Sequence, residues 1–429
     1  MNLVPTFSLL FILILIILIT GRYHRSVAAL LGALLTIFFG LEYGLFTSQN
    51  IINELISFID INTVLLVIGV MILAETVSRT GLFEFLGLSI ARGVGGGFRR
   101  VSLAFIVLTI LFSAVISNIT TIIIIGALTI SLAKKFGADP KQSLLYETLM
   151  ANVGGLTLMI SSIPNLIVAG QLKIGFIEFL TITAPLTLVL LLVSLLVISY
   201  QIKKTYGTEQ EVQIKVDPWS AIENKSLFYR AAAVFIIVVI LFIFEDQINV
   251  PIGLIAIAGA IALLILGGQE PESIFAGLDW GTIFFLTSFY VVVGGLETSG
   301  VVSSVANNIV QILSFNHTVA PVLNVWVTGI PSAIIDNIPM TLTLIPIMEQ
   351  VSIATGFSIK ILGWAIVFGA NLGGGLTPIG SASNIIALGI LKKQRITISW
   401  GEWFRKLGPL VMLQLLIATI YITIMSVII

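Results

Sequence analysis

The stretch Ser113-Ala-Val-Ile-Ser-Asn-Ile-Thr120 returns later in the chain as Ser332-Ala-Ile-Ile-Asp-Asn-Ile-Pro339, with a spacing of 219 residues. At the same spacing, Ala151-Asn-Val-Gly-Gly155 matches Ala370-Asn-Leu-Gly-Gly374. Chance similarity between apolar, glycine-rich segments would not preserve one spacing at polar positions so far apart. The sequence therefore predicts two homologous halves that arose by internal duplication.

The composition places most of the chain in a lipid environment. Of its 429 residues, 57% are hydrophobic and only 10% are charged, whereas a soluble globular chain carries roughly 25% charged residues. Apolar runs such as 9–20, 231–244 and 410–429 approach the length of a membrane span, about 20 residues. We expect an all-α polytopic membrane protein.

Several classes of site are excluded or disfavoured by the residue types present. The chain has no cysteine, so it has no disulfide, thiolate metal site or cysteine nucleophile. Its two histidines, His24 and His317, lie far apart in sequence, which disfavours a histidine metal site. The formal net charge is zero and no long basic block occurs, so no nucleic-acid partner is expected. No nucleotide-binding loop occurs either.

Each half is expected to hold about five transmembrane helices and one re-entrant hairpin. The N-terminal repeat covers 1–201, the cytoplasmic linker 202–229 and the C-terminal repeat 230–429. The predicted crossings of the first half lie near 5–20, 26–45, 61–79, 145–170 and 178–201, with a hairpin near 101–134 and an amphipathic arm at 81–92. Those of the second half lie near 230–246, 251–268, 281–300, 360–389 and 408–428, with a hairpin near 319–354.

An odd number of crossings per half inverts the second half relative to the first. The distribution of basic residues supports this layout, because cytoplasmic loops are enriched in Lys and Arg. If the loop with Arg22 and Arg25 is cytoplasmic, every Lys and Arg except Lys173 and Lys360 falls on that side. We therefore predict a multi-pass protein of the cell membrane with both termini external.

Four short segments place polar and helix-breaking residues inside apolar stretches. They are 117–121 and 336–339 at the hairpin tips, and 161–165 and 380–384 in the middle of the crossings near 145–170 and 360–389. Broken helices survive in a membrane only where protein or water covers them, and their ends offer N–H groups to anions and carbonyls to cations. The alternative is that these residues only cap helices or join them.

The paired spacing of the four segments favours a binding role over capping alone. The candidate substrate- and ion-binding residues are Ser117, Asn118, Thr120, Thr121, Ser161, Ser162, Asn165, Asp336, Asn337, Thr377, Ser381, Ser383 and Asn384. No catalytic residue and no organic cofactor is expected. No arginine is expected at these sites, which disfavours a multivalent anion.

Asp336 is the outstanding ionisable residue among these candidates. A carboxylate inside the membrane is costly and is by default a functional candidate. We predict that it couples transport by binding Na⁺ or by cycling a proton, with Na⁺ possible at Ser117, Asn118, Asp336 and Asn337. A cap that accepts N–H bonds from residues 338 and 339 is compatible with that role.

The remaining carboxylates are given mainly structural interpretations. Glu75 is expected to pair with Arg79 one turn later, with an orientation into the cavity as the alternative, and Glu147 is expected to be solvated or to cap a helix near the cytoplasmic surface. Glu297 lies near the external end of its crossing. Asp60 and Asp279 are each followed after three residues by Thr and then by an apolar run, so both are expected to be N-caps.

The residues around 332–346, 371–389 and 152–170 also carry a family resemblance. The sequence resembles the ion-transporter superfamily, in the branch of ArsB arsenite pumps, NhaD Na⁺/H⁺ antiporters, the P protein and citrate-transporter-like proteins. More distantly it is similar to divalent-anion:sodium symporters. The resemblance implies a scaffold, a mobile transport domain with elevator-type alternating access, and a homodimer. In a departure from P-protein-like relatives, Ser117-Asn118 stands where they have Asp-Asn, and Ser161-Ser-Ile-Pro164 where they often have Gly-Asp-Pro-Pro.

The sequence thus predicts a secondary active ion transporter and not an enzyme. The leading solutes are arsenite or antimonite, or Na⁺ in exchange for H⁺, with H⁺ or Na⁺ as the coupling ion. A Na⁺-coupled transporter of a small carboxylate or other anion is the alternative, and a passive ion channel is the alternative of another class. An arsenite pump would add a separate ATPase subunit as a partner.

Overall fold

The computed structural model describes residues 3–206, 217–313 and 319–428, and within these ranges every regular element is a helix. The all-helical membrane class predicted from the sequence is confirmed. The helices of the first half are α1 (Val4–Thr20), α2 (Arg25–Glu42), α3 (Ile51–Phe58), α4 (Ile61–Ser78), α5 (Leu82–Val94), α6 (Phe98–Ser113), α7 (Asn118–Phe136), α8 (Lys141–Gly154), α9 (Ile163–Gln171) and α10 (Phe176–Tyr206).

The second half contains a comparable series of helices. They are α11 (Lys225–Ile243), α12 (Glu245–Ile248), α13 (Ile252–Gly267), α14 (Pro271–Gly277), α15 (Trp280–Thr298), α16 (Val301–Leu313), α17 (Val319–Ser332), α18 (Asn337–Thr355), α19 (Ile359–Gly373), α20 (Ala382–Lys393), α21 (Trp400–Lys406) and α22 (Gly408–Ile428). Two short 3₁₀ helices, Met159–Ser161 and Pro218–Ala221, complete the described elements.

Local capping residues fix the ends of α7 and α18, the second arms of the two predicted hairpins. Ser117 caps α7 by accepting a hydrogen bond from the Thr120 amide, and Asp336 caps α18 by accepting one from the Ile338 amide. Both helices end at a glycine with left-handed backbone, Gly137 and Gly356, where a side chain would be strained. Each pair of ends is separated by the 219 residues of the repeat.

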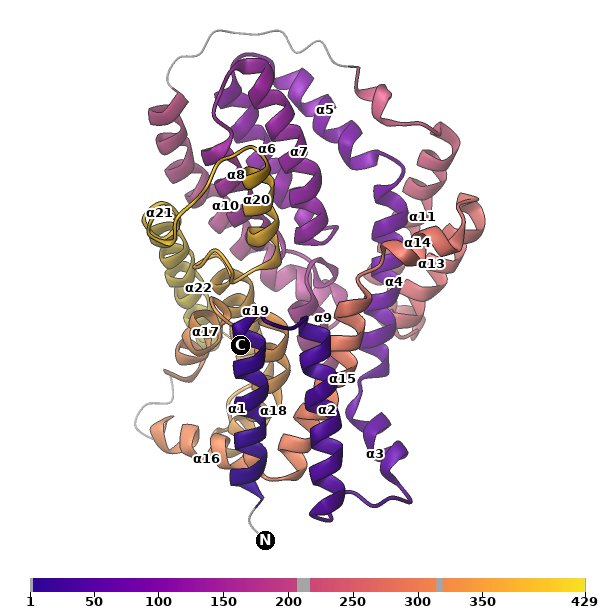
Figure 1. The fold of residues 1–429 in the computed structure, drawn as a ribbon, viewed down its shortest axis with the longest axis vertical. Coiled ribbons are helices and arrows are strands. Elements are labelled where there is room, and N and C mark those ends of the chain that lie inside the picture. Colours follow the sequence, from indigo (N-terminus) through magenta and orange to yellow (C-terminus); the bar gives the residue numbers. More distant parts are fainter. Residues whose placement is uncertain (1–2, 207–216, 314–318, 429) are drawn as a thin grey trace.

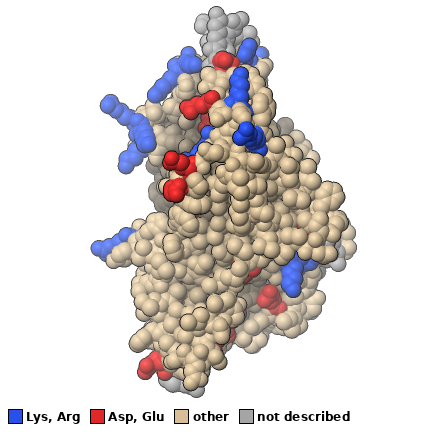
Figure 2. All heavy atoms as spheres, turned by 90° about the vertical axis from the view of Figure 1, so that its right-hand side faces the viewer, with Lys and Arg blue, Asp and Glu red and all other residues tan. Residues whose placement is uncertain are grey.

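Eight helices of the described chain are long and apolar enough to cross a membrane: α2, α4, α7, α10, α11, α15, α18 and the continuous segment of α21 and α22. The shorter helices α1, α13 and α19 are also apolar. Large apolar side chains such as Leu9, Leu196 and Ile265 are at least 70% exposed, as expected for lipid contact. In Figure 2 most of the charged side chains gather in the upper part of the molecule, and the rest of this face is a broad surface with few of them.

The helices form two packed groups. In the paired group, α4 packs against α13 and α15 against α2, with α1 beside α2 and α11 beside α13. In the broken-helix group, α6, α7, α8 and α10 pack together, as do α17, α18, α19 and α22, and α20 packs on α7 while α9 packs on α18. Figure 1 shows α6 and α7 in the upper part and α17 and α18 in the lower part of the molecule.

The two groups meet where α9 packs on α4 and α18 on α15, and they are also joined by α16, which packs on α15 and α18, and by α5, which packs on α4, α6 and α7. Glycine permits the first of these approaches, because a Cβ at Gly170 would lie 2.1 Å from the Thr63 hydroxyl oxygen. At Gly389, 219 residues later, an added Cβ would meet nothing within 4 Å. The equivalent positions of the two halves therefore have different surroundings.

Several details differ from the sequence-based expectations. α10 continues to Tyr206, beyond the predicted limit of 201. The short helices α3, α14 and α21 were not predicted, because each has eight residues or fewer and lacks the length of an apolar span. α5 agrees with the predicted arm at 81–92. Residues 207–216 of the predicted linker, and His317, lie outside the described residues.

Candidate functional site

The first hairpin tip lies between α6 and α7. The Ser117 hydroxyl accepts from the Thr120 amide at 3.1 Å and lies 2.9 Å from the Thr120 hydroxyl, so both side chains serve the helix cap. The Ser113 hydroxyl donates to Asn118 Oδ1 at 2.5 Å, and Asn118 Nδ2 lies 3.5 Å from Asn152 Oδ1 on α8. The Thr121 hydroxyl is buried and has no hydrogen-bond partner among the described residues.

The first broken crossing consists of α8, a loop at 155–162, and α9. Asn165 of α9 holds this loop in place, because its Nδ2 donates to the carbonyls of Gly155 and Leu158, each at 2.8 Å. The Ser161 hydroxyl donates to the same two carbonyls, at 2.8 and 2.5 Å. The loop thus satisfies its exposed backbone with side chains, as burial inside a membrane requires. The Ser162 hydroxyl is buried without a partner in the described chain.

The second broken crossing, α19 to α20, repeats this arrangement. Asn384 Nδ2 donates to the carbonyls of Gly374 at 2.9 Å and Thr377 at 2.8 Å. These residues stand 219 positions after Asn165, Gly155 and Leu158. The Thr377 hydroxyl in turn donates to the Ala333 carbonyl, next to the second hairpin tip. Ser381 and Ser383 lie with their hydroxyl oxygens 2.8 Å apart at the start of α20.

Side-chain amides join the two halves at these breaks. Asn371 of α19 donates to Asn165 Oδ1 at 2.8 Å, and Thr148 of α8 donates to Asn384 Oδ1 at 3.1 Å. Ser383 lies 3.5 Å from Asn152 Oδ1, whereas Asn152 Nδ2 is buried without a described partner. Asn152, Asn371 and Thr148 were not predicted as site residues. The repeated Ala-Asn-x-Gly-Gly motif was the signal for the two asparagines, since it placed both beside the breaks.

The second hairpin tip is bound to α2 of the paired group. Arg25 Nη1 lies 2.7 Å from Asp336 Oδ2, and Arg25 Nη2 lies 2.9 Å from Asp279 Oδ2 and 2.5 Å from the Thr282 hydroxyl. The expectation that no arginine lies at a candidate site was therefore wrong. It failed because Arg25 and Asp336 are brought together only by tertiary packing.

Arg25 also contributes to the lowered pKa of Asp279, which caps α15 as predicted by accepting from the Thr282 amide at 3.0 Å. Burial alone would raise the pKa of Asp279. Hydrogen bonds from Thr282 and the positive charge of Arg25 outweigh burial and hold that pKa below its ordinary value. The predicted cap at Asp336 is present as a bond from the Ile338 amide at 3.1 Å, whereas the bond predicted from residue 339 was wrong, because Pro339 has no N–H.

The residues suggested for Na⁺ have separate hydrogen-bond partners in this structure. Asp336 contacts Arg25, while Asn118 contacts Ser113 and Asn152, and no hydrogen bond joins Ser117 or Asn118 to Asp336 or Asn337 within the described ranges. Nor do the described residues contain a group of three His, Asp or Glu side chains suited to a metal ion.

The other carboxylates divide into confirmed and corrected predictions. Glu75 accepts from Arg79 Nε at 2.7 Å, as predicted. Asp60 caps α4 by accepting from the Thr63 amide at 3.2 Å, also as predicted. The interpretation of Glu147 as solvated or capping was wrong, because its side chain is 0% exposed and lies in the second turn of α8.

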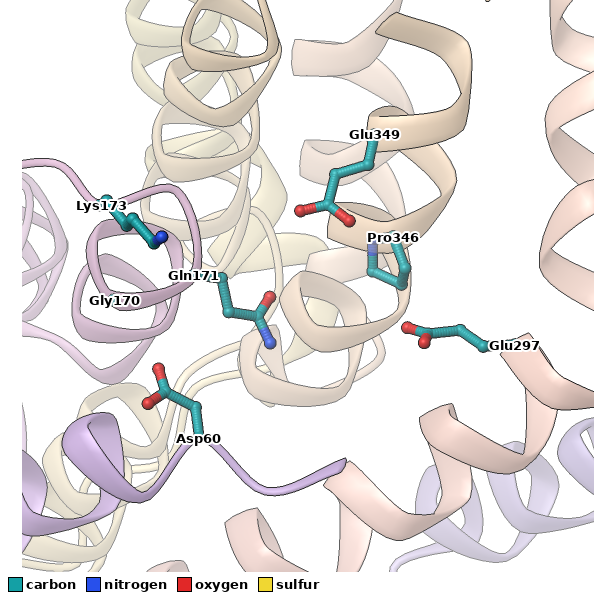
Figure 3. A pocket seen from close by; sticks show the side chains of 7 residues that line it. All are labelled: Asp60, Gly170, Gln171, Lys173, Glu297, Pro346 and Glu349. Atoms are coloured by element: carbon teal, nitrogen blue, oxygen red, sulfur yellow. The ribbon is translucent and has the colours of Figure 1, made fainter. Parts of the chain in front are cut away.

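A cavity of about 370 Å³ lies where the two helix groups meet (Figure 3). It is lined by Asp60, Gly170, Gln171, Lys173, Glu297, Pro346 and Glu349, which come from the ends or turns of α4, α9, α15 and α18. Glu297 and Glu349 are exposed. The cavity is therefore a polar, water-accessible space between the groups rather than an enclosed binding site.

The chain has many apolar helices of membrane-spanning length, and two of its crossings are interrupted by loops that asparagine amides stabilise. These features are those of a polytopic membrane transporter. The chain belongs to the CitMHS family, described as citrate transporters, whose model matches residues 13–369 and 239–428. The predicted branch of the ion-transporter superfamily is thereby confirmed.

Relatives and solved structures agree with this assignment. An uncharacterized transporter of Mycobacterium bovis is 26% identical over 418 residues, covering 96% of each chain. The mouse P protein is 26% identical, covering 95% of this chain and 58% of its own. The YdaH transporter of Alcanivorax borkumensis shares the fold with a TM-score of 0.67 at 12% identity, covering 94% of this chain and 98% of its own. MtrF of Neisseria gonorrhoeae, described among antimetabolite efflux pumps, gives a TM-score of 0.64 at 14% identity, covering 99% and 95%.

Proposed function

We propose that this protein is a secondary active transporter of a small oxygen-rich anion, a carboxylate in the first instance, coupled to H⁺ or Na⁺. The observation that carries the proposal is the set of buried polar atoms without partners around the first tip and break: Thr121 Oγ1, Asn152 Nδ2 and Ser162 Oγ. Buried polar groups are nearly always hydrogen-bonded. Unsatisfied donors at the ends of broken helices are groups that a solute with several oxygens would satisfy.

Helix N-termini support an anion over a cation at this position. The N-terminal ends of α7, α9 and α20 begin at Asn118, Ile163 and Ala382, beside the breaks and the first tip. Such ends present free N–H groups and a partial positive charge. The family description as citrate transporters points to the same class of solute.

Transport of an inorganic ion, such as arsenite or antimonite, or Na⁺ in exchange for H⁺, is the second candidate. One observation favours it: Arg25, the cation at the second tip, already contacts two carboxylates, Asp279 and Asp336. A site whose arginine is neutralised in this way also suits an uncharged hydroxylated solute or a small cation. A separate ATPase subunit belongs to this candidate alone.

We further propose that the broken-helix group moves as a transport domain against the paired group, in the elevator manner, and that the two halves are inverted repeats within a homodimer. Three features support the movement. The helices α5 and α16 connect the two groups as arms, a water-accessible cavity lies between the groups, and equivalent glycines of the two halves, Gly170 and Gly389, have unequal surroundings.

Purified protein in proteoliposomes tests the function. Uptake of labelled small carboxylates, uptake of arsenite, and internal pH are measured while pH and Na⁺ gradients are imposed separately. We expect saturable uptake of a carboxylate against its own gradient, driven by one of the two ions. Gradient-driven arsenite movement or Na⁺/H⁺ exchange without carboxylate uptake would select the second candidate. Non-saturable flux that only follows the solute gradient would indicate a channel and overturn the proposal.

A further inference from the structure

Glu147 is a fully buried carboxylate with one satisfied oxygen. Its side chain is 0% exposed, on a helix whose residues from Ser143 to Gly154 are all buried. Oε1 accepts from the Thr129 hydroxyl of α7 at 2.6 Å. Oε2 is buried and has no hydrogen-bond partner among the described residues.

No protein cation compensates this carboxylate in the described part of the chain. Asp336, Asp279 and Glu75, by contrast, each contact an arginine. The ionisable side chain of Tyr206, on α10, interacts electrostatically with Glu147. The basic residues on helices packed against α8 form no ion pair with it: Arg99 and Arg100 of α6, Lys134 and Lys135 of α7, Lys203 and Lys204 of α10, Lys360 of α19, and Lys392 and Lys393 of α20.

A buried carboxylate that no basic side chain neutralises requires another cation. Transferring an ionised carboxylate out of water costs far more than one hydroxyl hydrogen bond returns. A metal cation such as Na⁺ needs several oxygen ligands, whereas Glu147 is joined by a single hydroxyl. A proton needs only the carboxylate itself. When it binds Oε2, the oxygen without a hydrogen-bond partner, the side chain becomes a neutral carboxyl.

A row of hydroxyls leads from the protein surface toward Glu147. The Tyr206 hydroxyl donates to the exposed Asp139 carbonyl at 2.7 Å and lies 3.2 Å from the Ser143 hydroxyl. Ser143 precedes Glu147 by four residues on α8, so the two side chains lie on one face of the helix. Each hydroxyl can accept a proton on one side and donate one on the other.

We propose that Glu147 binds the proton whose movement drives transport, with Thr129 orienting its carboxyl and Ser143 and Tyr206 conducting the proton from the surface. Uptake converts the carboxylate to a neutral carboxyl, and release returns the proton to water and restores the charge. The link to the solute is short, because the next residue, Thr148, donates to Asn384 at the second break. The coupling of this proton to transport rests on the proposed function, but the proton site itself can be tested without transport.

Infrared difference spectroscopy of the purified full-length protein during a pH titration tests the site directly. A protonated buried carboxyl gives its own C=O band, which shifts in D₂O. We expect this band in the wild type, its loss in Glu147→Gln, and a displaced band in Glu147→Asp and Thr129→Val. Glu75→Gln, which removes a carboxylate held by Arg79, should leave it unchanged. Persistence of the full band in a folded Glu147→Gln protein, or its removal by NaCl but not by choline chloride at fixed pH, would overturn the proposal.

Proteoliposomes then separate the proton site from the proposed function. If Glu147 couples the proton, Glu147→Gln should lose pH-driven accumulation while keeping solute exchange at equal concentrations on both sides. Retained accumulation in Glu147→Gln under a pH gradient overturns the coupling role. If the infrared band belongs to Glu147 and no solute tested moves in any protein, the proton site stands and the proposed function fails.

Discussion

Arg25 and Asp336 lie 311 positions apart in the chain, yet Nη1 of one is 2.7 Å from Oδ2 of the other. The first belongs to α2 in the paired group and the second caps α18 in the broken-helix group. This ion pair crosses the boundary along which we propose that the transport domain moves. It must therefore be broken and remade whenever the tip changes place.

Replacement of Asp336 by Asn should abolish coupled transport and leave the protein folded. Asn can still accept the Ile338 amide bond that caps α18, but it cannot balance Arg25. The loss of coupling is measured as accumulation in proteoliposomes, and folding as monodispersity and thermal unfolding. In Asp336→Asn the guanidinium of Arg25 keeps its ion pair with Asp279, so the double variant Arg25→Gln/Asp336→Asn, which loses both pairs, should unfold at a lower temperature than Asp336→Asn alone. Unchanged accumulation in Asp336→Asn would contradict a role for this carboxylate in coupling.

Replacement of Asn165 or Asn384 by Ala should destabilise the protein to a similar degree. Each change removes the amide that donates to two loop carbonyls, of which those of Gly155 and Leu158 keep the Ser161 hydroxyl, and it removes the acceptor of one amide or hydroxyl of the other half. Each unsatisfied buried group costs about 1–3 kcal/mol. Thermal unfolding in detergent measures the effect, with Asn307→Ala on the exposed face of α16 as the control. An effect no larger than that of the control would show that the amides do not hold the loops.

Replacement of Gly373 by Ala should separate α17 from α19. An added Cβ would lie 2.0 Å from the Gly329 carbonyl oxygen, and backbone cannot yield as a side chain can. Overpacking of this kind costs about 1–3 kcal/mol. Gly389→Ala is the matched control, since it also lies near a broken crossing but meets nothing within 4 Å. Equal thermal stability of the two variants would contradict the close packing.

A disulfide should trap the present arrangement of the two helix groups. A Cβ at Gly170 would lie 3.4 Å from Thr63 Cβ, close to the separation of about 3.8 Å found in disulfides. Since the chain has no cysteine, Thr63→Cys/Gly170→Cys gives one defined pair, which should form on oxidation and stop transport until it is reduced.

The equivalent pair, Thr282→Cys/Gly389→Cys, reports the opposite arrangement. It is open in this structure, so it should cross-link slowly, and faster when solute and coupling ion allow the domain to move. Cross-linking is measured as the loss of free thiols, because each free cysteine reacts with a polyethylene-glycol maleimide and lowers the gel mobility of the chain. Transport that continues with the first pair fully oxidised, or a second pair that never cross-links, would contradict the proposed movement.

The parts of the site that depend on local sequence were predictable. Serine and aspartate caps, paired glycines and asparagines at the breaks determine where helices start and stop, so the hairpin tips and interrupted crossings were identified without tertiary information. Arg25 was not, because nothing near it in sequence indicates a partner as distant as Asp336. Glu147 was misinterpreted for a related reason: its distance from the surface follows from how α7 packs on α8, which an apolar run does not specify.

The asparagine bonds at the breaks have a mechanical consequence. Asn371 donates a hydrogen bond to Asn165, and Thr148 donates one to Asn384. Each half of the chain therefore helps to position the asparagine that stabilises the loop of the other half. The centre is therefore a stiff unit whose own shape need not change during a cycle. The changes during transport would then take place at its edges, where contacts such as the Arg25–Asp336 ion pair and the close approach at Gly170 join it to the paired group. The centre would then determine which solute is bound, and the contacts at its edges would determine how fast the transport cycle runs.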